Sequence, residues 1–227
     1  MKRIVESELL DTLPPDDPRA VRSRRDLRRV NAWMRNHVIM AGALKNNLSG
    51  LALEQITELG AGDGDFLLRV AKQISPHRTN VNAILLDRQN IVTPQTLAAF
   101  APLGWRAETI VADVFDWPQV PAQIVIANLF LHHFDREPLA RLLQRVASQA
   151  RLFVAVEPHR FQCPALLGPM LRLIGCNAVT RHDAVVSVRA GFIGRELSAL
   201  WPHPSDWELT EGSAGPFSHL FIARRRA

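Results

Sequence analysis

Between residues 55 and 156 the sequence alternates short strand-like runs with segments of helical periodicity. Some of the runs, such as Leu152–Val156, are apolar at every position, which is typical of strands buried on both faces. We predict strands at residues 55–59, 81–86, 105–111, 123–129 and 152–156, with helices at 65–74, 94–100 and 138–150. This alternation indicates an α/β protein whose parallel sheet has helices on both faces.

After Pro158 the alternation stops. Two apolar stretches, residues 164–174 and 183–201, have helical character and follow one another without a strand between them. The runs at 207–211 and 218–223 are joined by Gly-Ser-Ala-Gly-Pro and predict a hairpin. We therefore expect a doubly wound sheet of about seven strands, mostly parallel, with an antiparallel C-terminal hairpin strand.

The first 50 residues contain no comparable strand-like runs. Residues 11–18 form a turn-rich lead-in, and an arginine-rich helical stretch then runs to about Leu44. The predicted organisation is an N-terminal helical cap and lead-in at residues 1–50 and an α/β domain at 51–227. Within that domain, residues from about 160 to 200 are expected to form a helical cover over the ligand site.

The formal net charge of +5 is unevenly distributed, because six arginines lie between residues 19 and 29 and three more occupy residues 224–226. A nucleic-acid-binding helix can have this composition. However, Arg22, Arg25 and Arg29 share one helix face, and no aromatic residues interleave with basic ones elsewhere. A solvated helix face is the favoured interpretation, and nucleic acid is not an expected partner.

No apolar run approaches the roughly 20 residues that span a bilayer. The first residues carry charge where a signal peptide would need its apolar core, so the expected location is cytoplasmic. Peripheral membrane contact and the oligomeric state are left open. Cys163 and Cys176 lack the spacing of a zinc site and are expected to be reduced thiols.

A glycine-rich turn, Gly60-Ala61-Gly62-Asp63-Gly64, joins the first predicted strand to the first helix. Its glycines allow a tight turn and let a ligand approach the backbone closely. Asp65 occupies the place where a dinucleotide fingerprint has its third glycine, and both it and Asp63 would repel a pyrophosphate. The turn therefore favours a ligand with cationic groups. Asp87 ends the next strand, about 20 residues further on, where a carboxylate can hold ribose hydroxyls.

These features resemble the class I S-adenosylmethionine-dependent methyltransferases, whose first motif, E/D-x-G-x-G-x-G, is matched by Glu58–Gly64. Ala112–Val114 resembles the family's adenine-binding loop, and Asn128–Phe134 resembles its fourth motif. The resemblance implies a Rossmann-like fold that binds S-adenosylmethionine, leaving S-adenosylhomocysteine as product. The implied cofactor contacts are Glu58, Gly60, Ala61, Gly62, Gly64, Asp87, Arg88, Asp113, Val114, Asn128 and Leu129. It also implies that a helix through Asn31, Met34 and Arg35 closes over the cofactor.

Candidate catalytic bases follow the strands at the carboxyl edge of the sheet, where ligands bind. His133 and His132 come directly after the fourth strand, and we expect neighbouring side chains to point apart, so that at most one faces the substrate. Further candidates are His182, His219 and the segment Glu157–Arg160. Asp183 is also predicted as the N-cap of its helix. No metal-ligand spacing is convincing, and no metal is expected.

The predicted function is methyl transfer to a small aromatic or lipid-like acceptor, such as a phenol, quinol or polyketide of secondary metabolism, most simply on oxygen. Four alternatives remain, namely a C-methyltransferase, an RNA methyltransferase, a nicotinamide-dependent oxidoreductase and a non-catalytic cofactor-binding protein. Asn128–Leu131 lacks the D/N-P-P-Y/F motif of most N-methylating nucleic-acid enzymes, which disfavours the RNA enzyme. Asp63 and Asp65 disfavour a nicotinamide nucleotide.

Overall fold

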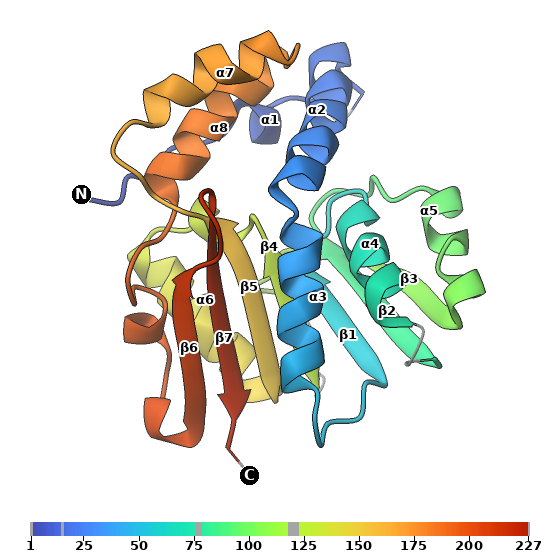
Figure 1. Cartoon of the computed structure of the whole chain (residues 1–227). Coiled ribbons are helices and arrows are strands. Elements are labelled where there is room, and N and C mark those ends of the chain that lie inside the picture. Colours follow the sequence, from blue (N-terminus) through green and yellow to red (C-terminus); the bar gives the residue numbers. More distant parts are fainter. Residues whose placement is uncertain (1, 15, 76–78, 118–122, 227) are drawn as a thin grey trace.

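The computed structural model describes residues 2–14, 16–75, 79–117 and 123–226 (Figure 1). Its seven-stranded sheet has the order β3-β2-β1-β4-β5-β7-β6. The strands are β1 (Gln55–Leu59), β2 (Val81–Asp87), β3 (Trp105–Val111), β4 (Ile124–Asn128), β5 (Leu152–Pro158), β6 (Trp207–Ser213) and β7 (Ser218–Arg225). Strands β1 to β5 are parallel, while β7 runs antiparallel to both β5 and β6. This confirms the predicted fold class.

Two apolar layers explain why β4 and β5 are almost continuously apolar. On one face, α3 (Asn36–Asn47) and α4 (Asp65–Ile74) pack against side chains that include Val154 of β5. On the other face, α6 (Arg136–Gln149) packs against side chains that include Phe153 of the same strand. Alternate residues of a strand point to opposite faces, so every residue of β5 is buried. The short α5 (Pro94–Ala98) ends two residues before the predicted end at residue 100.

The N-terminal helical stretch consists of two long helices rather than one. After the short α1 (Leu9–Thr12), α2 (Pro18–Met34) begins with Asp17 as its N-cap, and α3 follows after Arg35. Arg35 adopts a left-handed conformation with φ of 57°, which ends α2 and redirects the chain. Figure 1 shows α3 lying on the sheet and α2 standing beyond its carboxyl edge beside the C-terminal helices.

The C-terminal helices complete a helical layer above the carboxyl edge of the sheet (Figure 1). This layer contains α7 (Leu167–Leu173) and α8 (Ala178–Ala190), and α8 contacts both α1 and α2. The predicted helix at 183–201 is wrong at both ends, because α8 starts with Asn177 as its N-cap and stops before Gly191. The predicted N-cap role of Asp183 is therefore also wrong. Among the described helices, none has the length and apolar composition needed to cross a bilayer.

Asp183 lies inside α8, where it stabilises another helix. Its two carboxylate oxygens accept hydrogen bonds from the backbone N–H groups of Leu9 (2.8 Å) and Leu10 (3.0 Å) at the start of α1. The side chain is buried, so these bonds satisfy a charge that would otherwise be costly to desolvate. This contact fixes the N-terminal segment across the carboxyl edge of the sheet.

A substitution at Gly191 tests the packing between the end of α8 and the end of β5. A Cβ atom at this position would overlap the carbonyl group of Pro158, whereas nothing lies within 4 Å of a Cβ built on Gly212. We expect Gly191→Ala to lower the free energy of unfolding by about 1–3 kcal/mol, as overpacking does. Gly212→Ala should change it by less than about 1 kcal/mol. Urea denaturation followed by circular dichroism measures both, and equal effects would contradict this account.

Candidate active site

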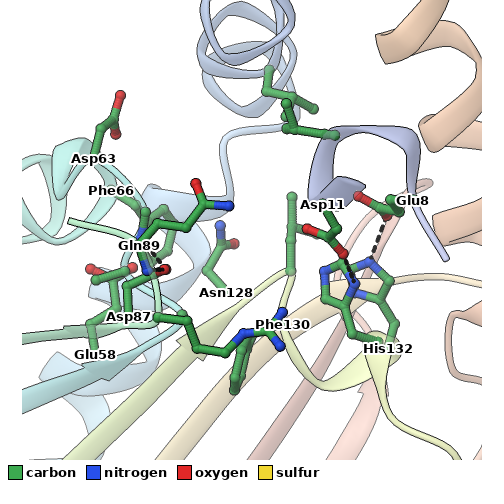
Figure 2. A pocket seen from close by; sticks show the side chains of 18 of the residues that line it. Glu8, Asp11, Glu58, Asp63, Phe66, Asp87, Gln89, Asn128, Phe130 and His132 are labelled. Atoms are coloured by element: carbon green, nitrogen blue, oxygen red, sulfur yellow. Dashed lines mark hydrogen bonds and ion pairs between the residues drawn. The ribbon is translucent and has the colours of Figure 1, made fainter. Parts of the chain in front are cut away.

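A cavity of about 640 Å³ lies at the carboxyl edge of the sheet, between the strand ends and the N-terminal segment. Figure 2 shows acidic side chains at both ends of this cavity, with Asn128 and Phe130 between them. One end is formed by the glycine turn after β1 and the end of β2. The other contains His132, His133 and carboxylates of the N-terminal segment. The volume is typical of a small-molecule site.

The glycine turn places bare backbone against the cavity. Gly60, Gly62 and Gly64 have φ values of 67°, 55° and 76°, which side-chain-bearing residues rarely adopt. A Cβ on Gly60 would overlap the Phe130 ring, and one on Gly64 would lie 2.9 Å from Leu85 Cδ1. Nothing lies within 4 Å of a Cβ on Gly62. Gly60, Ala61 and Gly62 line the cavity, whereas Gly64 is buried behind the turn and serves packing.

Asp87 ties this turn to the end of β2. Its carboxylate accepts hydrogen bonds from the backbone N–H groups of Gly62 and Gln89, both at 2.8 Å. Carboxylate oxygens have two lone-pair sites each, so both oxygens retain acceptor capacity toward the cavity that Asp87 lines. Asp87 therefore positions the turn and also presents a carboxylate to a ligand.

Glu58 is an acid at this end whose oxygens are not both hydrogen-bonded among the described residues. Its side chain is buried, its Oε2 atom has no hydrogen-bond partner among the described residues, and burial raises the pKa of its carboxyl group well above the ordinary value. The two acids noted in the sequence are paired instead, Asp63 with Arg28 of α2 at 2.6 Å and Asp65 with Arg69 at 2.5 Å. Glu58 is thus the group that a cationic ligand could satisfy.

The middle of the cavity is lined by the ends of β3 and β4. Asp113 accepts a hydrogen bond from the backbone N–H of Phe115 at 2.9 Å, and Val114 is buried beside it. Asn128 Oδ1 accepts a hydrogen bond from Asn36 Nδ2 at 3.0 Å, in a buried network that ties β4 to α3. Four other predicted residues also line the cavity, namely Ala112, Arg88, Leu129 and Asn31, whereas Met34 and Arg35 do not.

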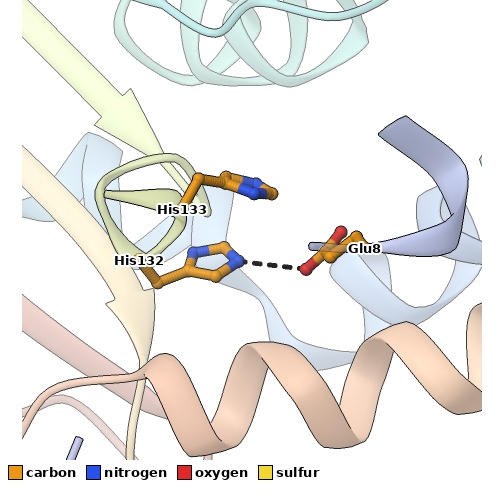
Figure 3. Close-up of side chains that lie close together, drawn as sticks. All are labelled: Glu8, His132 and His133. Carbon is orange, nitrogen blue, oxygen red and sulfur yellow. Dashed lines mark hydrogen bonds and ion pairs between the residues drawn. The ribbon is translucent and has the colours of Figure 1, made fainter. Parts of the chain in front are cut away.

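Buried carboxylates hold His132 on both sides. Glu157, at the end of β5, accepts hydrogen bonds from the backbone N–H groups of Phe130, Leu131 and His132, and its Oε2 lies 2.9 Å from His132 Nδ1. The Nε2 atom therefore points into the cavity, where it lies 3.3 Å from Glu8 Oε1 (Figure 3). Glu8 also accepts a hydrogen bond from Ser187 of α8.

The neighbouring carboxylates determine whether His132 is protonated. Burial lowers the pKa of His132, but the hydrogen bonds with Glu157 and Glu8 outweigh it and raise the pKa to about 9. Burial would raise the pKa of Glu8, yet the contact with His132 lowers it to about 2. At neutral pH His132 is an imidazolium between two carboxylates, and Glu8 is ionised.

The rings of His132 and His133 lie on the same side of the chain, contrary to the prediction that they point apart (Figure 3). Their centroids are 4.3 Å apart because both residues belong to a short 3-10 helix, Leu131–His133, rather than to an extended strand end. Burial and the neighbouring imidazolium lower the pKa of His133, whose Nδ1 lies 3.4 Å from Asp11 Oδ2. His133 is therefore neutral at neutral pH.

Comparison with solved structures identifies the fold. The plantazolicin methyltransferase BpumL, in complex with SAH, has a TM-score of 0.62 at 13% identity, with 93% of this chain and 92% of that chain covered. The mitomycin 7-O-methyltransferase MmcR has a TM-score of 0.56 at 19% identity, covering 96% and 61%. An O-methyltransferase family protein from Burkholderia thailandensis has a TM-score of 0.58 at 17% identity, covering 92% and 60%.

The chain has the fold of the class I methyltransferases. The sequence matches no protein-family model and no curated protein at a significant level. In this fold the glycine turn, the end of β2 and the loop after β4 meet at one edge, as the sequence motifs predicted. Identities of 13–19% leave the reaction to be argued from the residues of the cavity itself.

The other residues predicted as catalytic do not line the cavity. The His182 side chain is about half exposed and pairs with Asp183 at 3.0 Å, so the structure gives its predicted catalytic role no support. His219 is buried against Glu211 at 2.9 Å, and Arg160 is buried against Glu196 at 2.6 Å. Of the segment Glu157–Arg160, only Glu157 takes part, through His132.

Sequence reasoning missed Glu8 and Asp11. Both come from the N-terminal segment, where no motif or periodicity marks them, and they reach the histidines only because α1 docks on α8. Glu8, His132 and His133 also place three ligand atoms within 4.8 Å of one another, a spacing that could hold a metal ion. In the structure Glu8 and His132 instead neutralise one another as an ion pair.

The raised pKa of His132 links stability to pH. Its folded value of about 9 exceeds the ordinary 6.5, so the stabilisation is complete below pH 6.5 and is lost as the pH rises through 9. We expect the free energy of unfolding to fall by up to about 3 kcal/mol across this window. Urea titrations at several pH values measure it. His182→Gln should keep the dependence and His132→Gln should flatten it; the same slope in both would refute the assignment.

Proposed function

We propose that the protein is an S-adenosylmethionine-dependent methyltransferase that methylates an oxygen of a small aromatic or lipid-like acceptor. One observation carries the proposal: a single cavity joins a glycine turn with an unsatisfied buried acid, Glu58, to a histidine, His132, that Glu157 orients. The first feature suits a nucleoside with a cationic amino-acid tail. The second suits removal of a proton from the acceptor.

The residues at the glycine turn fit the cofactor. Glu58 Oε2 would accept a hydrogen bond from the ammonium of the methionine part, which would satisfy this buried acceptor. Asp87 would hold the ribose hydroxyls, and Asp113 with Val114 would contact the adenine. When bound, this cofactor supplies the electrophilic methyl group and its own leaving group. The chain therefore needs to orient the acceptor and remove its proton.

His132 is the favoured base. Glu157 fixes the Nδ1–H of the ring, so Nε2 is the atom that can take a proton from the acceptor hydroxyl. A pKa of about 9 is close to that of a phenol, about 10, so proton transfer between the two is nearly balanced. The contact between Glu8 Oε1 and His132 Nε2 must break before Nε2 can take this proton. His133, the first choice from sequence, is a second candidate because it is neutral and faces the cavity beside Asp11.

The acceptor end of the cavity is partly apolar. Val5, Leu10, Phe130 and Phe134 line the cavity between the glycine turn and the N-terminal segment, and the rings of Phe130 and Phe134 meet edge to face with centroids 5.1 Å apart. Aromatic and aliphatic walls favour a flat or lipid-like acceptor over a highly charged one. MmcR is a mitomycin 7-O-methyltransferase and BpumL a plantazolicin methyltransferase, so methyltransferases that act on individual compounds share this fold.

Isothermal titration calorimetry tests the cofactor. We expect S-adenosylhomocysteine to bind and NAD to give no heat, since the Asp87 carboxylate at this end of the cavity would repel its phosphates. Asp87→Asn should weaken binding at least about ten-fold because a charged acceptor for the ribose becomes neutral. Asp116→Asn, at an exposed residue outside the cavity, should leave affinity unchanged. Binding of NAD without S-adenosylhomocysteine would overturn the proposal.

Turnover tests the base. Phenols, quinols and polyketide-like compounds are screened for S-adenosylhomocysteine release, and the best acceptor is used throughout. We expect His132→Gln to lower kcat about 10²- to 10⁴-fold with little change in cofactor affinity. His182→Gln should have wild-type activity. If His133→Gln shows the large loss and His132→Gln does not, His133 is the base.

The pH profile separates a base from a structural histidine. The rate should rise with pH toward the pKa of His132, about 9, as the imidazolium loses its proton. Glu8→Gln removes one of the two charges that raise this pKa, so the rise should move to lower pH with the same acceptor. An unmoved profile would contradict the assignment. Activity lost on chelation and restored by a divalent cation would assign the cluster to metal binding instead.

A further inference from the structure

The outer surface of the helical layer has an exposed apolar ridge. We define the α7 ridge as Leu166, Met170, Leu173 and Ile174, whose exposed fractions are 69%, 38%, 89% and 49%. The opposite side of the same helix carries Leu167 and Leu171, which are buried against the protein. Packing of α7 on the body therefore accounts for only one of its two apolar faces. A cluster of exposed large apolar side chains indicates an interaction surface.

The surroundings of the α7 ridge are positively charged. Residues 161–182 contain no acidic residue, and Arg172 lies exposed within the helix. From α2, Arg29 donates a hydrogen bond to the carbonyl of Ile174 at 2.8 Å, and Arg22 donates one to the carbonyl of Gly175 at 3.4 Å. These bonds hold two guanidinium groups beside the end of the ridge.

Acidic residues near the ridge are already engaged. Asp26 of α2 is buried and accepts a hydrogen bond from the backbone N–H of Asn177 at 2.8 Å. Asp17, at the start of α2, is paired with Arg19 at 2.8 Å. Arg29 is paired with Asp26 at 3.5 Å. Arg22 and Arg172 are exposed and have no ion-pair partner among the described residues, so their charge is available to an outside partner. Figure 1 shows α7 at the edge of the helical layer, on the side away from the sheet.

We propose that the α7 ridge docks on an anionic lipid bilayer. An interfacial helix buries apolar side chains at the boundary between headgroups and acyl chains, while its basic neighbours meet lipid phosphates. A twofold-symmetric contact with a second copy would bring Arg22 and Arg172 of both copies to one interface to which residues 161–182 contribute no acid, and this repulsion disfavours a dimer through the ridge. The proposal concerns a surface outside the cavity and does not depend on the proposed function.

Co-sedimentation of the full chain with vesicles tests this surface. We expect binding to phosphatidylcholine vesicles containing about 30% phosphatidylserine, weak binding to phosphatidylcholine alone, and loss of binding as salt rises. The double variant Leu166→Ser/Leu173→Ser should lower the partition coefficient at least about ten-fold. Arg22→Gln/Arg172→Gln should lower binding to the anionic vesicles and leave the weak binding to phosphatidylcholine unchanged.

Val111→Ser is the matched control, because Val111 is 52% exposed on β3 and lies outside the ridge. It should bind vesicles as the wild type does. Unchanged S-adenosylhomocysteine binding or unchanged thermal unfolding of the double variant shows that it is folded. Equal binding to both vesicle types, or full binding by the ridge variant, would overturn the proposal. A dimer in light scattering that Leu166→Ser/Leu173→Ser abolishes would assign the ridge to self-association instead.

Discussion

The carboxylate of Glu157 accepts three backbone hydrogen bonds from residues 130–132 and contacts His132 Nδ1, all in a buried position at the end of β5. A buried carboxylate must be neutralised and hydrogen-bonded to persist. Glu157 therefore shapes the loop after β4 and keeps a proton on His132. Glu8 is the second partner of the imidazolium, from the N-terminal segment that lines the same cavity.

The N-terminal segment is held by long-range contacts that no local sequence pattern predicts. Arg3 donates hydrogen bonds to the backbone carbonyls of Phe134 (2.8 Å), His132 (3.0 Å) and Ala190 (2.6 Å), which binds this segment to both the loop after β4 and the end of α8. Asp183 holds α1 from the other side. Because Glu8 lies between these anchors, the segment both closes the cavity and sets the charge of His132. One segment thus both borders the cavity and contributes to the charge of His132.

Sequence reasoning was accurate where the signal was local. The bounds of β1, β3 and α4 are those predicted, because short strand-like runs, a glycine turn and helical periodicity define them within a few residues. It failed for α8, where apolar residues continue past the helix end but Gly191 packs its backbone on Pro158. It also missed the break at Arg35, since nothing in an arginine-rich helical stretch marks a left-handed residue.

By itself, the sequence determined the parallel sheet, the glycine turn and the acids at the strand ends, because periodicity and turn chemistry act over short distances along the chain. Only the tertiary structure decided which histidine is charged and which acid is left without a hydrogen-bond partner that a ligand could supply. Glu8 lies 124 residues from His132 and Glu157 lies 25 residues from it, yet these two carboxylates outweigh burial in the pKa of the ring. Arg28 likewise neutralises Asp63 across 35 residues and leaves Glu58 as the unsatisfied acid. Electrostatic energies depend on distance in space, which the order of residues does not contain.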